Sequence, residues 1–169
     1  MRIAVAGAHC SGKSTLIDDF LAAHPDYAHE PEPAEWLDEF PDRPTAADFL
    51  QQLEISVERL SAHAPGARMI VERSPLDFVA YLQALEDLRR ERTAPLIEGA
   101  LELAARGMRH LDLLVVTSPD GVAAPEAEDL DLRDAMHERL LALVGQANVI
   151  EVAGPPRRRL ASIEQAMRH

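Results

Sequence analysis

The sequence predicts an α/β protein with three layers, in which helices cover both faces of a five-stranded parallel sheet. Short apolar segments of strand length alternate along the 169 residues with segments of helical spacing. A glycine-containing loop joins the first of these strands directly to the first helix. Hydrophobic residues make up 47% of the chain, enough to bury a substantial core. We therefore expect residues 1–169 to form a single domain.

The first half of the chain is divided by prolines and polar breaks. The expected strands are residues 2–6, 27–30 and 68–71. Residues 34–40 fit one or two helical turns, and Thr45 fits the N-cap of a longer helix. The apolar residues of that helix share one face: Phe49, Leu53, Val57 and Leu60. Three polar residues fall on another face: Gln52, Ser56 and Arg59.

The second half continues the same alternation. Pro75 and Pro95 each fit the first turn of a helix, and the second of these helices is expected to end near Gly107. Further strands are expected at residues 110–116 and 149–152, and further helices at residues 132–144 and 157–167. Strands that alternate with helices imply a parallel sheet that is covered on both faces.

The phosphate-binding pattern G-x-x-x-x-G-K-[ST] matches at every fixed position in Gly7-Ala8-His9-Cys10-Ser11-Gly12-Lys13-Ser14. Glycines let the backbone approach an anion closely, and the free N–H groups at a helix start favour negative charge. Lys13 would reach the β- and γ-phosphates, and Ser14 would place its hydroxyl on Mg²⁺. A tight turn without a ligand is the alternative. The expected nucleotide-binding residues are Gly7, His9, Cys10, Ser11, Gly12, Lys13, Ser14 and Thr15.

Charge and composition exclude several classes of function. With 17 basic and 29 acidic residues, the net charge is −12, which argues against a general nucleic-acid or anionic-membrane surface. One cysteine rules out an internal disulfide and suits a reducing cytoplasm. We also expect no signal peptide and no membrane span, and therefore a cytoplasmic protein.

Candidate site residues follow several of the expected strands. The phosphate-binding loop follows the first strand, Glu30 and Glu32 follow the second, and Glu72-Arg73 follow the third. The carboxyl ends of parallel strands meet at one edge of the sheet, where ligands bind in such folds. We therefore expect these side chains to gather there. Solvated loop charges or a structural ion pair would be the simpler interpretation of each carboxylate.

Together these motifs resemble the P-loop small-molecule kinases. The segment 69–74 is similar to the strand-plus-Glu-Arg-Ser motif of deoxynucleoside kinases, whose group includes the thymidylate-kinase-like enzymes, and residues 75–82 are similar to bacterial ATP-binding proteins related to nicotinamide riboside kinases. Residues 32–36 resemble the Glu-Pro…Trp segment of deoxynucleoside kinases with a spacing one residue shorter, so Glu30 remains a rival to Glu32. Residues 49–52 are similar to the Phe-Gln helix of that family.

The resemblance implies a three-layer P-loop NTPase fold and a set of site roles. Glu32 would deprotonate or orient an acceptor hydroxyl, and Glu72 would hold Mg²⁺. Arg73 would contact that hydroxyl or the transferring phosphoryl group, and Gln52 would read the base of the acceptor. Trp36 would stack on a substrate ring or pack under its own loop.

A lid-like segment at about residues 119–140 departs from the pattern of these kinases. Their lid carries arginines, whereas this chain has no Lys or Arg between Arg109 and Arg133. Arg133 and Arg139 are the nearby substitutes, and surface ion pairing is their simpler role. We assign Arg133 a candidate catalytic role and expect slow turnover if neither arginine reaches the phosphates.

The sequence therefore predicts an ATP- and Mg²⁺-dependent phosphotransferase. The γ-phosphoryl group would pass to a hydroxyl of a small molecule, most simply a nucleoside or related riboside. The alternatives are an NTPase or nucleotide sensor without a small-molecule acceptor, and an interaction module that retains the P-loop. Related kinases pair through helices beside the sheet, so the resemblance allows a homodimer.

Overall fold

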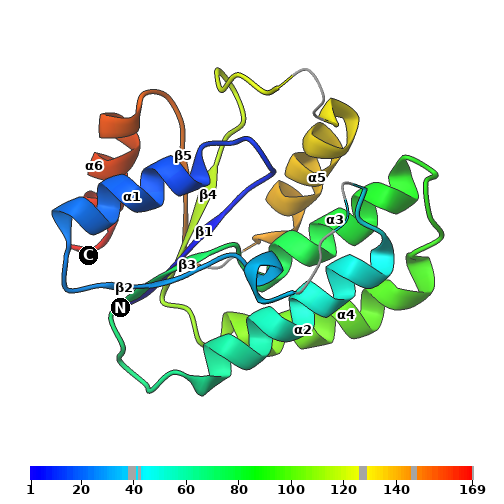
Figure 1. Cartoon of the computed structure of the whole chain (residues 1–169), viewed down its shortest axis with the longest axis horizontal. Helices are drawn as coiled ribbons and strands as arrows, with labels where there is room; N and C mark the ends of the chain where they lie inside the picture. The colour runs from blue at the N-terminus through cyan, green and yellow to red at the C-terminus, as the bar shows by residue number, and fades with distance from the viewer. Residues whose placement is uncertain (38–40, 42, 126–128, 146–147, 169) are drawn as a thin grey trace.

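A computed structural model describes residues 1–37, 41, 43–125, 129–145 and 148–168 (Figure 1). Five parallel strands form one sheet in the order β2–β3–β1–β4–β5. The strands are β1 (Arg2–Ala6), β2 (Ala28–Glu30), β3 (Met69–Glu72), β4 (Leu113–Thr117) and β5 (Val149–Val152). The helices are α1 (Lys13–Ala23), the 3₁₀ helix η1 (Pro33–Trp36), α2 (Ala46–Ala62), α3 (Pro75–Asp87), α4 (Ala94–Met108), α5 (Leu130–Leu143) and α6 (Pro156–Ala166).

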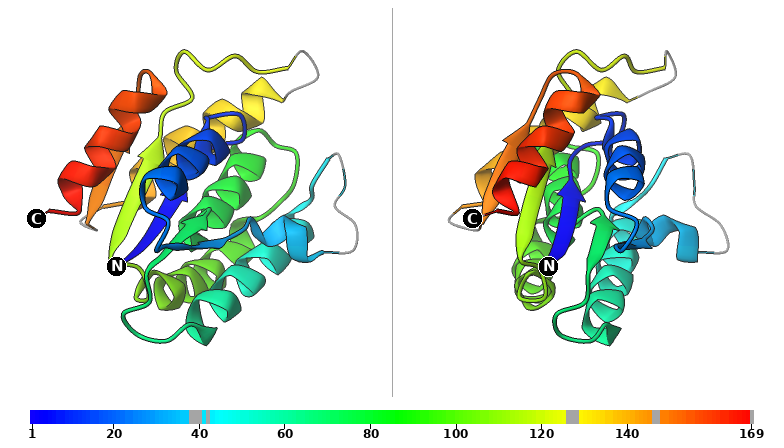
Figure 2. Two further views of the ribbon diagram at one scale, coloured as in Figure 1. Left: turned by 60° about the vertical axis from the view of Figure 1, so that its left-hand side comes forward. Right: turned by 90° about the vertical axis from the view of Figure 1, so that its left-hand side faces the viewer.

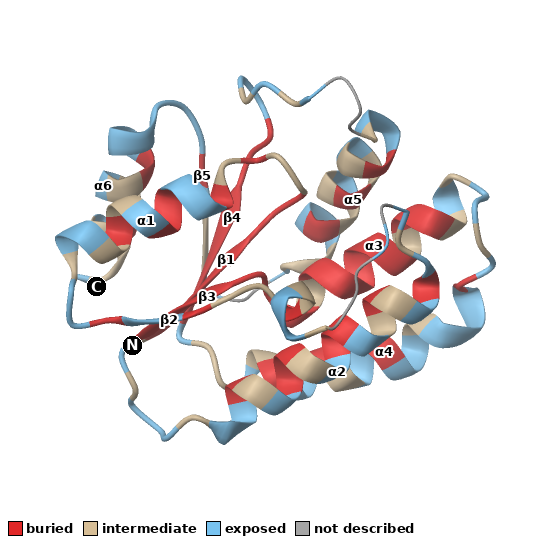
Figure 3. Ribbon diagram, viewed as in Figure 1, coloured by how far each residue is buried: buried red, intermediate tan, exposed pale blue. Residues whose placement is uncertain are grey.

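Helices cover both faces of the sheet, which confirms the predicted fold class. Helices α1 and α6 pack on one face, and α2, α3, α4 and α5 lie on the other (Figures 1 and 2). Successive strand residues point to opposite faces, so Ile3 and Val5 join the α1/α6 core, whereas Ala4 and Ala6 join the larger core. Burial is concentrated in the three central strands β1, β3 and β4 and in the inward-facing sides of the helices (Figure 3).

Two helices begin at capping boxes that the sequence encodes locally. Thr45 accepts a hydrogen bond from the N–H of Asp48, whose carboxylate in turn accepts one from the N–H of Thr45. Ser74 and Asp77 form the corresponding box at the start of α3, and Pro75 occupies the first turn. The N-cap predicted at Thr45 is therefore confirmed.

Several predicted boundaries were wrong by one to three residues. Strand β4 begins at Leu113 instead of residue 110, because the N–H groups of His110 and Leu111 donate to the carbonyls of Gly107 and Met108 at the end of α4. Gln52 and Ser56 are both buried, although they lie off the apolar face of α2, and η1 packs against this helix. The helical turn predicted for residues 34–40 corresponds to η1, and its residues 38–40 fall outside the described residues.

The parallel arrangement brings the carboxyl ends of the strands to one edge, as the sequence predicted. β1 and β3 are paired in register with Val5 opposite Glu72, so the loop at Gly7 and the turn at Arg73 leave the sheet side by side. β4 pairs with the other side of β1 and ends at Thr117, next to the same loop. Within the described ranges, no helix combines the length and the apolar character that crossing a membrane requires.

Helix α4 packs closely against its neighbours at Gly107. A Cβ atom at this position would lie 2.7 Å from Cγ of Pro75 and 2.8 Å from Cγ2 of Val57. The Gly107→Ala variant should therefore lose about 1–3 kcal/mol of unfolding free energy through overpacking. Gly99 lies on the same helix, and a Cβ there would meet nothing within 4 Å. The control Gly99→Ala should gain about 0.5–1 kcal/mol, as alanine is the better helix former. Urea unfolding of both variants tests this, and equal stabilities would contradict the packing.

Candidate functional site

The loop between β1 and α1 adopts the conformation that an anion-binding loop requires. Gly7 and Gly12 have φ values of 143° and 82°, which side chains with a Cβ rarely adopt. A Cβ at Gly7 would also lie 2.3 Å from Oγ1 of Thr117. Gly12 is the N-cap of α1, and no side chain caps this helix and no acidic residue occupies its first turn. The positive end of the helix therefore faces the loop without a carboxylate from its own first turn.

Neighbouring elements hold the loop in place. The N–H of Gly7 donates to Oδ1 of Asp77 at 2.9 Å, and the N–H of His9 donates to the hydroxyl of Tyr81 at 3.1 Å. On the opposite side, the Ser11 hydroxyl donates to the carbonyl of Ala8 at 2.7 Å. Helix α3 thus fixes the loop from one side, before any ligand binds.

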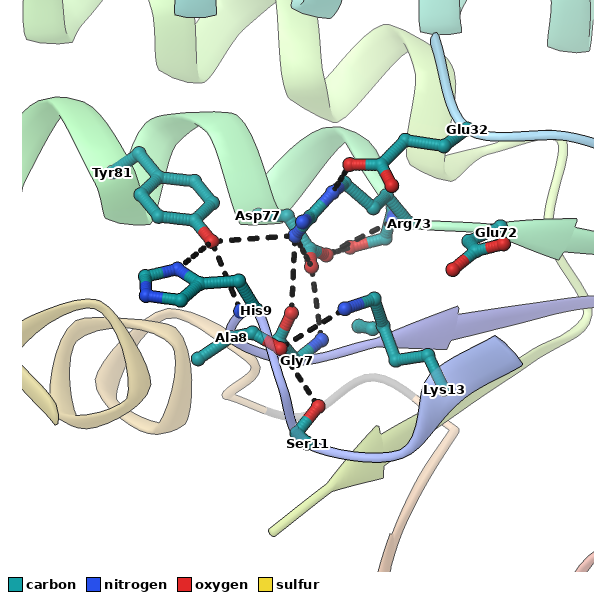
Figure 4. Close-up of polar contacts among 12 residues, drawn as sticks. Gly7, Ala8, His9, Ser11, Lys13, Glu32, Glu72, Arg73, Asp77 and Tyr81 are labelled. Carbon is teal, nitrogen blue, oxygen red and sulfur yellow. Dashed lines mark hydrogen bonds and ion pairs between the residues drawn. The ribbon is translucent and has the colours of Figure 1, made fainter. Parts of the chain in front are cut away.

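Lys13 lies inside the loop and is almost fully buried. Its ammonium group donates to the carbonyl of Ala8 at 2.9 Å (Figure 4). Burial, together with the positive charge of Arg73, lowers the pKa of Lys13 to about 8. The negative charges of Glu32, Asp77 and Glu72 oppose this shift without cancelling it.

Ser14 and Glu72 meet beside the loop. The Ser14 hydroxyl donates to Oε1 of Glu72 at 2.9 Å, so the two predicted Mg²⁺ ligands are in contact. Hard oxygen groups of this kind suit Mg²⁺, which usually takes one or two protein ligands and completes its shell with water and phosphate oxygens. Across the described residues, no three His, Cys, Asp or Glu side chains form a metal cluster of their own. The pair therefore fits an ion that is shared with a nucleotide.

Arg73 connects the loop to the rest of the site (Figure 4). Its φ of 68° is unusual for a residue with a Cβ, and its N–H donates to the carbonyl of Val5 at 3.0 Å. One guanidinium nitrogen donates to the carbonyl of Gly7 at 3.1 Å and lies 3.6 Å from Oδ1 of Asp77. Its Nε donates to the carboxylate of Glu32. One buried cation thus contacts the phosphate loop, helix α3 and the segment after β2.

The charged groups around Arg73 shift one another's pKa values. Burial alone would lower the pKa of the Arg73 guanidinium, but Tyr81, Glu32 and Asp77 raise it well above its usual value. Burial likewise favours the neutral form of Glu32, yet the cations Arg73 and Lys13 hold the pKa of Glu32 below its usual value. Glu32 is therefore ionised at neutral pH. Burial raises the pKa of Asp77, against the opposing effect of Arg73.

A cavity of about 1000 Å³ opens next to Arg73. Its walls combine apolar and aromatic side chains with a few charged ones. The Phe49 and Tyr81 rings stack in this wall, with centroids 4.4 Å apart and planes inclined by 3°. The lining residues are His9, Glu32, Pro41, Arg43, Pro44, Thr45, Phe49, Gln52, Arg73, Phe78, Tyr81, Leu85, Arg90, Glu91, Asp129 and Leu132.

Some of the predicted site residues meet at this cavity and others do not. Glu32, Arg73 and Gln52 line it, next to the loop that holds the predicted nucleotide-binding residues. Trp36 lies elsewhere, with its ring 3.8 Å from the guanidinium carbon of Arg59. Arg133 lies on α5 with its Nε 3.3 Å from Asp134, and it is not part of the cavity wall.

Glu30 occupies a different environment from Glu32. Its carboxylate accepts hydrogen bonds from Nε and a terminal nitrogen of Arg59, the latter at 3.0 Å, and lies 2.8 Å from Nε2 of His63. It is buried against α2 and does not line the large cavity. Of the two rivals, Glu32 is therefore the carboxylate at the large cavity.

Sequence reasoning missed four residues of this site. Asp77 and Tyr81 position the loop, Phe49 forms the wall of the cavity, and Arg90 lines the cavity and pairs with the carboxylate of Asp129. The Ser74-to-Asp77 capping spacing could have drawn attention to Asp77. Nothing local marks the others, because their roles depend on contacts between distant elements.

A phosphate loop at the carboxyl edge of a parallel sheet, with Lys13 and Ser14 at the start of the following helix, defines the P-loop class of nucleotide-binding proteins. The chain belongs to the AAA domain family, whose sequence model matches residues 2–159. No curated protein sequence matches the chain.

Solved structures share the whole fold at low sequence identity. Deoxyadenosine kinase from M. mycoides with bound dATP aligns over 100% of both chains, with a TM-score of 0.71 and 12% identity. Thymidylate kinase from Candida albicans aligns over 99% of this chain and 90% of its own, with a TM-score of 0.69 and 14% identity. The resemblance to P-loop kinases is therefore confirmed at the level of the fold.

The lowered pKa of Lys13 predicts how nucleotide affinity depends on pH. Above about pH 8 the ammonium loses its proton in the free protein, whereas bound phosphates favour the charged form. ATP affinity should therefore fall above pH 8, by up to about tenfold per pH unit, with uptake of a proton on binding. Titration calorimetry at pH 7, 8 and 9, in buffers of different ionisation enthalpy, measures both effects. In Lys13→Arg the fall in ATP affinity above pH 8 should disappear, because the guanidinium stays charged. The same fall in that variant would show that another group causes it.

Proposed function

We propose that the protein is an ATP-dependent phosphotransferase that moves the γ-phosphoryl group to a hydroxyl of a small molecule. The observation that carries this proposal is the cavity of about 1000 Å³, which is lined by His9 of the phosphate loop and by Glu32 and Arg73 beside it. A nucleotide hydrolase needs room only for one water molecule beside the γ-phosphate. A cavity of this size, adjoining a carboxylate and a buried arginine, suits an organic acceptor.

The chain supplies the groups that such a transfer needs. The acceptor hydroxyl would donate a hydrogen bond to Glu32, and its oxygen would attack the γ-phosphorus of ATP. The new O–P bond forms as the bond to the β–γ bridging oxygen breaks, ADP leaves, and the hydroxyl proton passes to Glu32. Because Arg73 keeps Glu32 ionised, the carboxylate is ready to accept that proton at neutral pH.

Positive charge around the transferring group comes from Lys13 and Arg73. Lys13 would exchange its bond to the Ala8 carbonyl for phosphate oxygens, and Arg73 would neutralise charge that develops between donor and acceptor. Ser14 and Glu72 would hold Mg²⁺, which supplies further positive charge to the β- and γ-oxygens. Catalysis would then depend mainly on positioning and charge, as phosphoryl transfer generally does.

A nucleoside or related riboside is the acceptor class that suits the cavity best. Phe49, Phe78 and Tyr81 provide apolar surface for a flat ring, and the amide of Gln52 lies within the same wall to meet its polar edge. Trp36 has no part in this proposal, since it packs against Arg59. The nucleoside and nucleotide kinases with the same fold agree with this acceptor class.

A nucleotide hydrolase or sensor without an acceptor is the second candidate. It is favoured by the segment after β4, where Arg133 is engaged with Asp134 and does not reach the cavity wall. Fewer cations over the phosphates would leave the transition state less well neutralised. Such a protein would bind ATP well and turn it over slowly.

A mass-spectrometric screen tests the proposed activity. Purified protein with Mg·ATP and a pool of nucleosides and ribosides should convert one compound to its monophosphate, with formation of ADP. The Lys13→Ala variant should give no product, because the loop loses its phosphate-binding cation. Hydrolysis of ATP without any phosphorylated compound would instead favour the hydrolase.

Glu32→Gln should lower kcat by about 10²–10⁴-fold while the ATP affinity changes little. The glutamine keeps a hydrogen-bond acceptor for Arg73 but cannot take the proton. Glu35 is an exposed neighbour on η1, and Glu35→Gln serves as the control with unchanged kcat. Steady-state kinetics on the acceptor found by the screen would measure this. A large loss in Glu30→Gln with full activity in Glu32→Gln would transfer the role to Glu30.

A further inference from the structure

A buried arginine outside the proposed mechanism lies against the phosphate loop. Arg159 belongs to α6, on the opposite side of the sheet from the acceptor cavity, and only 4% of it is exposed. Its guanidinium donates to the carbonyl of Ser11 at 2.6 Å, to that of Gly154 at 2.8 Å and to that of Ser118 at 3.3 Å. One side chain thus joins the phosphate loop to the segments that follow β4 and β5.

The charge of Arg159 is not neutralised by the protein. Its hydrogen-bond acceptors are uncharged carbonyls, and none of the carboxylates in the described part of the chain forms an ion pair with it. Arg73, which is buried to a similar extent, pairs with Glu32 and Asp77, whereas the buried Arg2 at the other end of β1 also donates to carbonyl groups. A buried cation without a counter-charge is unfavourable unless an anion compensates it.

Neighbouring arginines add to the positive charge around Arg159. Arg157, Arg158 and Arg159 follow one another in the first turn of α6, where the helix dipole is positive, and no acidic residue lies in that turn. Three cations at this end of a helix repel one another in a chain whose net charge is −12. Such a concentration of positive charge fits an anion that binds nearby.

The phosphate loop is the place where that anion would bind. A terminal nitrogen of Arg159 lies 3.1 Å from the position that a Cβ of Gly12 would take, and Gly12 is the N-cap residue of α1. Helices α1 and α6 pack side by side, so this contact belongs to the core of the α1/α6 layer (Figure 2). The guanidinium therefore lies directly behind the loop that would surround the phosphates.

We propose that Arg159 is a positioning residue of the nucleotide site, whose positive charge is compensated by the phosphates of the bound nucleotide. It acts through the carbonyl of Ser11, which it holds away from the phosphates, and through its electric field at the loop. This inference rests on the proposed use of ATP at the P-loop. It gives the site a third cation, beside Lys13 and Arg73, from helix α6.

Nucleotides that differ in phosphate number separate this role from a structural one. Dissociation constants for AMP, ADP and ATP would be measured by titration calorimetry for wild type, Arg159→Gln and Arg159→Lys. In Arg159→Gln the loss of affinity should grow from AMP to ATP and reach on the order of tenfold for ATP. Arg159→Lys retains the charge and should recover most of that loss, although it makes fewer hydrogen bonds.

The exposed neighbour Arg158 provides the matched control. Arg158→Gln removes the same charge from the same helical turn and should leave all three dissociation constants within about twofold, because solvent screens it. If Arg159→Gln folds poorly, Arg159→Lys still tests whether the charge is sufficient, because its ATP affinity should then stay close to that of wild type although hydrogen bonds are lost. A loss of equal size for AMP, ADP and ATP, or the same loss in the lysine variant, would overturn the inference.

Failure of the inference and failure of the proposed function give different results. If wild type binds ATP and Arg159→Gln binds each of the three nucleotides as tightly as wild type does, Arg159 has only a structural role. The proposed function is then unaffected. If wild type binds none of the three nucleotides, the proposed function is wrong and this inference falls with it.

Discussion

The buried contact between Arg73 and Asp77 holds the whole site together. Asp77 accepts hydrogen bonds from the start of its own helix and from the N–H of Gly7, so the phosphate loop is attached to α3. Arg73 lies beside it and extends to Glu32, which belongs to a different part of the sheet edge. Each charge is tolerated in the interior because the other is present. The loop, the large cavity beside it and the Glu32 carboxylate in its wall are therefore positioned by one small group of atoms.

Local sequence patterns were enough to predict most of the fold and the central residues of the site. The P-loop pattern predicted the strand, the loop and the helix at the N-terminus, and the capping chemistry of Thr45 predicted where α2 begins. The parallel order of the sheet followed from alternation, and it correctly brought Ser14 and Glu72 together. These features depend on residues close in sequence or on the single rule that parallel strands end at one edge.

Contacts between elements that are distant in the sequence could not be predicted from local patterns. Gln52 is buried although it lies off the apolar face of α2, and no periodicity within this helix predicts that burial. Glu30 and Glu32 have different surroundings because Arg59 of α2 and His63 just after it contact Glu30 from 29 and 33 residues further along the chain. Arg159 reads in the sequence as one more charge in an arginine run, yet it is the buried member of that run. Long-range packing, rather than residue type, gives each of these side chains its environment.

The edge position of β2 has a consequence for self-association. An edge strand exposes backbone groups to which a strand of another molecule can add, and this is a common route to aggregation. β2 has only three residues, and Pro31 and Pro33 follow it without an N–H to donate. Another chain therefore finds little backbone to pair with along this side of the sheet. The two prolines that flank Glu32 thus protect the molecule against the growth of intermolecular sheets.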